Sequence, residues 1–154
     1  MKHLIPLLSI FAIGSANASE ILTSIKPIQM ITYEITQGVS EPDLLLESNT
    51  SPHDYALKPS DVKRVRKADL VVWFGNDLEP FLTKVLEGQK NVLTISEVDG
   101  LNLREFSEDG HNHDHDGHNH GSHDPHFWLG HEQSIKAAEA ISQKLSELDP
   151  TNKD

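Results

Sequence analysis

A continuous apolar run, Leu70-Val71-Val72-Trp73-Phe74, constrains the fold of this chain more than any other feature. A strand with one face in water alternates apolar and polar residues, whereas a strand buried on both faces is apolar throughout. Strands of the second kind belong mostly to parallel sheets, which carry helices on both faces. The run therefore predicts an α/β protein in which residues 70–74 form an inner strand.

The rest of the chain alternates short apolar segments with segments of helical periodicity, as a parallel sheet requires. Further strands are expected at residues 20–25, 42–46 and 92–95. Helices are expected at residues 28–37, 59–67, 77–86 and 133–148. This order predicts a parallel four-stranded sheet flanked by helices, in which ligands bind beyond the carboxyl ends of the strands.

The first eighteen residues have the pattern of an export signal. Lys2 precedes an apolar run from Leu4 to Gly14, and Ala16-Asn17-Ala18 matches a signal-peptidase site. The run is about half as long as the roughly 20 apolar residues that span a bilayer, so direct membrane insertion is not expected. We expect residues 1–18 to be a signal peptide, cleaved after Ala18, and the mature protein to be periplasmic.

The composition excludes several classes of function. The 154 residues include 13 basic and 24 acidic side chains, a formal net charge of −11, and no cysteine. This acidic balance argues against nucleic acid as a partner, because its phosphates require a basic surface. The absence of cysteine excludes disulfides, thiolate zinc sites, cysteine catalysis and an acylated-cysteine anchor.

Histidine is unusually abundant, and seven of the ten histidines lie between His111 and His126. Residues 105–125 hold six carboxylates and no lysine or arginine, a composition that cannot form a core, so a mobile surface loop is expected. Imidazole is a common metal ligand near neutral pH. We expect auxiliary metal binding by six histidines of this loop: His111, His113, His115, His118, His120 and His123. A merely solubilising acidic insert is the alternative.

Two other histidines, His53 and His126, each follow a proline and have an aspartate within two residues. Proline restricts the backbone, and a neighbouring carboxylate can orient an imidazole that binds metal. For either histidine taken alone, a structural role in a loop is the favoured interpretation. Beside a His-rich segment, the pair favours a shared metal site.

An enzyme is the less favoured interpretation. The run from His113 to His118 nearly matches the H-x-H-x-D-H sequence of metallo-hydrolases, but Gly117 stands where the aspartate should be. Repetitive His/Asp sequence produces such near matches readily. The sequence has no nucleophile elbow, metalloprotease H-E-x-x-H or phosphate loop. We therefore expect a binding protein and no catalytic residues.

Three segments of the chain resemble the metal-binding receptors of bacterial zinc and manganese ABC importers: 51–61, 68–75 and 124–129. The acidic His-rich insert before the third segment is typical of the zinc receptors in this family. The resemblance implies two similar α/β lobes joined by a long helix, with the metal between them. It also implies that His53 and His126 are the two metal ligands of the first lobe.

The resemblance further implies a division of the chain and one departure from the family. Residues 19–149 are expected to form the first lobe and residues 150–154 to begin the connecting helix, with the second lobe and its ligands absent. Some zinc receptors carry a glutamate that can approach the metal where this chain has Pro52.

The function implied is that of a monomeric periplasmic receptor that captures Zn²⁺ and delivers it to the membrane permease of a zinc ABC importer. Imidazole suits zinc better than manganese, but nickel and copper also bind imidazole, so the choice of zinc rests partly on the resemblance. A periplasmic metal buffer or metallochaperone without a transporter partner remains the alternative. The two Pro-His sites favour the receptor, because a buffer needs only the His-rich segment.

Overall fold

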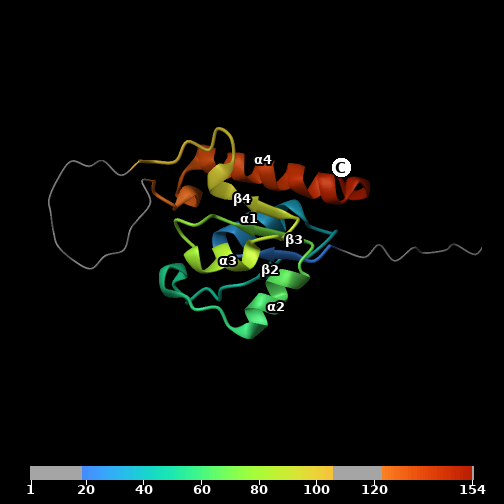
Figure 1. Ribbon diagram of the computed structural model, residues 1–154. Helices are drawn as coiled ribbons and strands as arrows, with labels where there is room; N and C mark the ends of the chain where they lie inside the picture. Colours follow the sequence, from blue (N-terminus) through green and yellow to red (C-terminus); the bar gives the residue numbers. More distant parts are fainter. Residues whose placement is uncertain (1–18, 106–122, 154) are drawn as a thin grey trace, which may run out of the picture.

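The computed structural model describes residues 19–105 and 123–153. In these residues a sheet is formed by β1 (Ile21–Thr23), β2 (Asp43–Leu44), β3 (Leu70–Trp73) and β4 (Val92–Thr94). The strand order is β2-β1-β3-β4, and every neighbouring pair is parallel. The predicted fold class, a parallel four-stranded sheet flanked by helices, is confirmed (Figure 1).

Helices cover both faces of this sheet. They are α1 (Lys26–Ile35), α2 (Pro59–Lys67), α3 (Thr83–Leu86) and α4 (His131–Leu148). α1 and α4 pack on one face, and α2 and α3 pack on the other. Figure 1 shows α4 and α2 on opposite sides of the sheet. Among the described residues, no helix has both the length and the apolar character needed to cross a lipid bilayer.

The inner strand β3 supplies side chains to both cores. Leu70 and Val72, with Phe74 just beyond the strand, pack with α1 and α4. Val71 and Trp73 point the other way and pack with α2 and α3. All five are at most 7% exposed. Full burial of a large apolar side chain contributes roughly 1.5–3 kcal/mol, so this continuous apolar run stabilises both layers.

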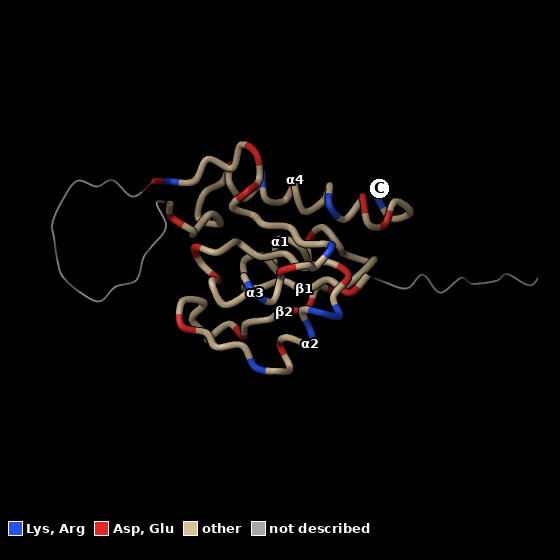
Figure 2. The backbone as a smooth tube through the Cα atoms, in the orientation of Figure 1, with Lys and Arg blue, Asp and Glu red and all other residues tan. Residues whose placement is uncertain are grey.

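The ends of α2 follow from its sequence. Pro59 begins the helix, where its missing N–H needs no partner, and the Asp61 carboxylate accepts a hydrogen bond from the Lys58 backbone N–H at 2.9 Å. The last turn is basic, with Arg64, Arg66 and Lys67, and complements the negative end of the helix dipole (Figure 2). The helix predicted at residues 59–67 is therefore confirmed.

The prediction of a helix at residues 77–86 is wrong for the first half of this range. A 3₁₀ turn, η2 (Pro80–Leu82), leads into α3, and no α-helical residue precedes Thr83 in this stretch. Proline has no N–H and disfavours the helical conformation in the residue before it. Glu79 accordingly has φ −126° and ψ 59°. The chain turns at this point and carries Glu79 into the interior.

The carboxyl ends of β1 and β3 form the switch point of the sheet. The chain leaves β1 toward α1 on one face and leaves β3 toward α3 on the other. The Ser24 N–H, just after β1, donates to the Val72 carbonyl at 3.0 Å, and the Leu46 N–H donates to the Ser24 carbonyl at 3.0 Å. Parallel α/β sheets place their ligands at such a point.

Candidate metal centre

His53 lies in the loop between β2 and α2. It is the middle residue of a short 3₁₀ turn, η1 (Pro52–Asp54), and its side chain is exposed. The Ser51 hydroxyl oxygen accepts a hydrogen bond from the His53 backbone N–H at 3.3 Å. The serine cap and the proline at the first position of the turn therefore set the backbone of this histidine.

The same loop is attached to the protein through Tyr55. The Tyr55 hydroxyl donates to the Asp61 carboxylate at 2.7 Å, and the Tyr55 ring meets the Phe81 ring edge-on, with centroids 5.3 Å apart. Burial opposes the charge of Asp61, but the hydrogen bonds from Tyr55 and Lys58 hold the pKa of that carboxyl below its usual value. We call residues 51–58, held in this way, the His53 arm.

His126 is oriented by direct contact with Asp124. Asp124 Oδ1 accepts the His126 backbone N–H at 3.0 Å and lies 2.7 Å from His126 Nδ1. The backbone N–H and the ring hold the pKa of Asp124 below its usual value, so the carboxylate is ionised and can only accept. Nδ1 therefore donates its proton to Asp124. In a neutral imidazole this leaves the Nε2 lone pair for a metal ion.

Aromatic packing attaches His126 to the core. The next residue, Phe127, is 3% exposed and stacks on Phe74, with ring centroids 5.9 Å apart and planes at 12°. Trp128 lies edge-on to the His126 ring at 5.1 Å. Because Phe74 immediately follows β3, this packing places the 3₁₀ turn η4 (Phe127–Leu129) at the carboxyl end of that strand. We call residues 124–129 the His126 arm.

His53 and His126 thus belong to the same edge of the sheet. The His53 arm follows β2, which ends beside Ser24, and the His126 arm rests on Phe74 at the end of β3. In Figure 1 both segments lie on the side of the sheet opposite to the C-terminal end of α4. Within residues 19–105 and 123–153 there is no cluster of three or more potential metal-binding His, Asp or Glu side chains. This edge supplies two imidazoles, whereas a zinc site takes four ligands.

Most of the His-rich segment lies outside the described residues, including His111, His113, His115, His118 and His120. The sixth histidine, His123, is described. It forms an isolated antiparallel bridge with Glu105, and its Nε2 lies 3.9 Å from the Glu105 carboxylate. The Asp124 N–H donates to the Arg104 carbonyl at 2.7 Å. Residues 105 and 123 are therefore paired directly beside the carboxylate that orients His126.

The structure also reveals a buried acid that the sequence analysis missed. Glu79 is 0% exposed, and its Oε2 accepts the backbone N–H groups of Phe74 at 2.9 Å and Gly75 at 3.1 Å. Burial raises the pKa of Glu79 to about 7, although the Ser24 hydroxyl and the two amides favour the ionised form. The sequence signals this buried acid only by its position between Leu78 and Pro80.

Gly75 allows the chain to turn tightly above this acid. Its φ is +143°, and a Cβ atom built on it would lie 2.4 Å from the Ser96 hydroxyl oxygen. A side chain here would strain the backbone and displace Ser96. Only glycine therefore fits the end of β3 as it stands.

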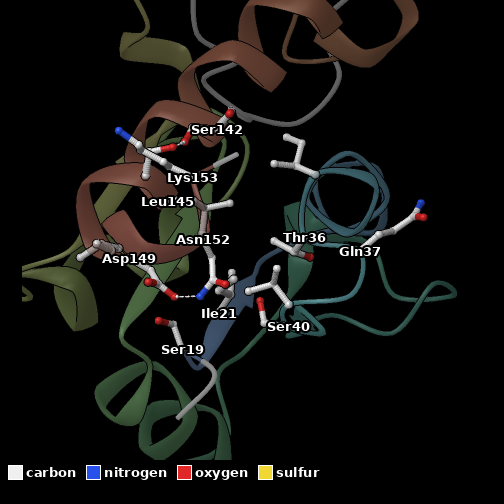
Figure 3. Close-up of a pocket in the computed structure, with 14 residues that line it drawn as sticks. Ser19, Ile21, Thr36, Gln37, Ser40, Ser142, Leu145, Asp149, Asn152 and Lys153 are labelled. Carbon is white, nitrogen blue, oxygen red and sulfur yellow. Dashed lines mark hydrogen bonds between the residues drawn. The ribbon is translucent and has the colours of Figure 1, made fainter. Parts of the chain in front are cut away.

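A cavity of about 150 Å³ lies at the opposite edge of the sheet, between the C-terminal parts of α1 and α4 (Figure 3). Its lining includes Ser19 and Ile21 at the start of β1, Thr36 after α1, and Leu145 of α4. Ser19 and Ile21 place this cavity at the amino end of β1, whereas both histidine arms lie at the carboxyl edge. The cavity is therefore separate from the candidate metal centre.

Comparison with known proteins points to one family. Residues 21–154 match the family model of ZnuA, described as the periplasmic component A of the zinc-uptake complex. The chain is 39% identical over 155 residues to the high-affinity zinc uptake system protein ZnuA of Yersinia pestis, with 89% of this chain and 49% of the relative covered. It is 37% identical over 169 residues to the protein of the same name from Haemophilus ducreyi, with 99% and 54% covered.

A solved structure agrees with these sequence matches. The Mn-bound periplasmic metal binding protein of Candidatus Liberibacter asiaticus superposes with a TM-score of 0.71 at 26% identity, covering 88% of this chain and 47% of that one. The chain spans about half the length of the curated relatives that it matches. The resemblance noted in the sequence is confirmed: the chain belongs to the ZnuA family of periplasmic zinc-uptake components.

Proposed function

We propose that this chain forms the first lobe of a periplasmic receptor that captures Zn²⁺ and delivers it to the membrane permease of an ABC importer. His53 and His126 are the two zinc ligands of this lobe, and zinc is the cargo. The observation that carries the proposal is the convergence of the two histidine arms on one edge of the sheet, in a chain of the ZnuA family. The remaining ligands come from outside the described residues.

The contacts around His126 support its role as a ligand. The Asp124 carboxylate accepts a hydrogen bond from Nδ1, and Trp128 and Phe127 limit the movement of the ring and its backbone. A ligand whose orientation is set before the metal arrives loses less entropy on binding. Imidazole nitrogen is a good ligand for zinc and a poorer one for manganese, which prefers carboxylate and water oxygens.

The surface beside His126 supports closure by a second lobe. Leu129 is 79% exposed and follows the half-buried Trp128, so apolar side chains border the candidate ligand at the edge of the sheet. Apolar surface at the rim of a site is usually covered in the complete protein. Closure over this surface would exclude water and supply the missing ligands.

Zinc titration of histidine variants tests the site. The loop-silent variant, with His111, His113, His115, His118, His120 and His123 each changed to Asn, removes the competing imidazoles while keeping the chain at full length. We expect it to keep one weak zinc site when titrated against a chromophoric chelator at pH 7.5. In this background, His53→Ala or His126→Ala should each abolish that site, because water cannot replace an oriented imidazole without loss of affinity.

His131→Ala is the matched control, because His131 is exposed, lies at the start of α4 and is only five residues from His126. It should leave the zinc affinity unchanged. Zinc binding that survives both His53→Ala and His126→Ala would place the site elsewhere and contradict the proposal.

Delivery to a permease separates the receptor from a simple periplasmic buffer. The chain extended by the second lobe of a relative should restore growth at low zinc to a bacterium that lacks its own receptor. The same extended chain carrying His126→Ala should fail to do so. A buffer would instead protect cells from excess zinc without supporting uptake.

A further inference from the structure

One short segment touches both histidine arms. Residues 74–82, which we call the brace, run from the end of β3 through η2. At the start of the brace, Phe74 stacks on Phe127 of the His126 arm. Near its end, Phe81 packs edge-on against Tyr55 of the His53 arm. The two arms are far apart in the sequence, so the brace is the part of the chain that connects them through ring contacts.

The conformation of the brace depends on Glu79. Its carboxylate accepts both backbone N–H groups at the start of the brace, those of Phe74 and Gly75. The Glu79 N–H in turn donates to the Gly75 carbonyl at 2.9 Å, and the Leu82 N–H donates to the Glu79 carbonyl at 3.0 Å. One residue thus ties the part that carries Phe74 to the part that carries Phe81.

Glu79 also faces the end of β1. Its Oε1 and the Ser24 hydroxyl oxygen are both buried, and neither has a hydrogen-bond partner of ordinary geometry in the described part of the chain. The backbone of Ser24 accepts from Leu46, which begins the connection to the His53 arm. A fully buried acid is costly to keep, and hydrophobic packing alone does not require one here. The presence of Glu79 at the switch point between β1 and β3 therefore indicates a role other than packing.

We propose that Glu79 is a positioning residue for the metal site, holding the brace so that both histidine arms keep the spacing that zinc requires. This inference rests on the proposed function and adds to it a residue that does not touch the metal. This role requires a side chain at position 79 that accepts hydrogen bonds from the Phe74 and Gly75 N–H groups. A glutamine there can accept the same two N–H groups and donate to the Ser24 hydroxyl oxygen.

Three variants in the loop-silent background test this role. Glu79→Ala removes the acceptor, and Glu79→Gln keeps it. Glu87→Ala is the matched control, because Glu87 is an exposed glutamate that follows α3. Each variant is titrated with zinc, its thermal unfolding is followed by circular dichroism, and its histidine ring resonances are recorded by nuclear magnetic resonance.

Glu79→Ala should weaken zinc binding by about 10-fold or more, the range found when groups that orient metal ligands are removed. It should also shift the ring resonances of both His53 and His126. Glu79→Gln should restore the zinc affinity and both resonances, and Glu87→Ala should leave them unchanged. A role in stability alone would lower the unfolding temperature of Glu79→Ala without changing the affinity of the protein that remains folded.

Phe81→Leu tests the brace even if Glu79→Ala does not fold. It keeps an apolar side chain but removes the ring contact with Tyr55, so it should shift the His53 resonances and leave those of His126 in place. The inference is overturned if a folded Glu79→Ala binds zinc like its parent, or if Phe81→Leu shifts neither histidine. It is also overturned if Glu79→Gln is as weak as Glu79→Ala.

These outcomes differ from failure of the proposed function. If His53→Ala and His126→Ala leave zinc binding intact, the metal site itself is misplaced. If those two variants abolish binding while Glu79→Ala has no effect, His53 and His126 remain the proposed ligands and only the positioning role of Glu79 is contradicted.

Discussion

The two histidine arms are held in different ways. In the His126 arm, the fixing contacts fall on the histidine itself: Asp124 lies 2.7 Å from Nδ1, and Trp128 borders the ring. In the His53 arm, Tyr55, two residues after the histidine, bonds to Asp61 and packs on Phe81. Asp124 thus orients the His126 ring, and Tyr55 anchors the loop that carries His53.

If His53 and His126 are the zinc ligands proposed above, the His126 ring is already oriented when the metal arrives. An imidazole with a preset tautomer and orientation can bind first, at little cost in conformational entropy. The loop that carries His53 is fixed by the Ser51 cap and by the contacts of Tyr55 with Asp61 and Phe81. The orientation of His126 by Asp124 would then contribute to the affinity of this first encounter.

The largest expected effect comes from the brace that serves both arms. Burial raises the pKa of Glu79 from its ordinary value of 4.5 to about 7, so the folded protein binds more protons than the unfolded chain between these pH values. Its contribution to stability is therefore lost as the pH rises through this interval. Glu79→Gln should escape the loss and gain roughly 3 kcal/mol over the parent between pH 4.5 and 8.

Urea unfolding of both proteins at the two pH values measures this change. Asp61, Asp124 and Asp149 also titrate with shifted pKa values, but they are present in both proteins and cancel in the difference. An equal stability difference at both pH values would show that Glu79 does not titrate in this range.

The next effect separates the arms. Asp124→Ala should weaken zinc binding by about 10- to 100-fold in the loop-silent background, because the His126 ring loses the partner that fixes its tautomer and orientation. Chelator competition at pH 7.5 measures the loss. Asp99→Ala, at an exposed aspartate, is the control and should bind like the parent. Equal affinities in the two variants would mean that His126 needs no orienting carboxylate, and the contrast between the arms would disappear.

The smallest effect belongs to the His53 arm. Tyr55→Phe keeps the ring contact with Phe81 but removes the hydrogen bond to Asp61. The free energy of unfolding should fall by about 1–2 kcal/mol. Zinc affinity should fall by less than in Asp124→Ala, because the change acts on the loop and not on the imidazole. A larger loss of affinity than in Asp124→Ala would reverse the comparison.

Much of the fold could be predicted because its signals are local. The continuous apolar run of β3 indicated burial on both faces, and Pro59 with the basic residues that end α2 marked the bounds of that helix. The helix predicted at residues 77–86 starts too early, because the prediction followed the spacing of the apolar residues and did not account for Pro80. The spacing was real, since Leu82, Val85 and Leu86 are buried, but proline prevents the helix from starting before it.

The candidate site was predictable only in part. Proline and aspartate beside His53 and His126 are visible in the sequence, and the pairing of Asp124 with His126 follows from their proximity. The roles of Phe74, Phe81 and Glu79 depend on which loops meet at the switch point, and no local pattern encodes that meeting. A buried acid such as Glu79 looks like any surface glutamate until the turn at Pro80 is known.

The close approach at Gly75 has a consequence for how such chains can diverge. A Cβ atom at Gly75 would lie 2.4 Å from the Ser96 hydroxyl oxygen, so a substitution at Gly75 strains the backbone and requires the Ser96 side chain to move. A relative that carries a larger residue at the position of Gly75 must therefore have rebuilt the end of β3. The residue at this one position indicates, from sequence alone, whether a distant homologue retains the same turn at the end of β3.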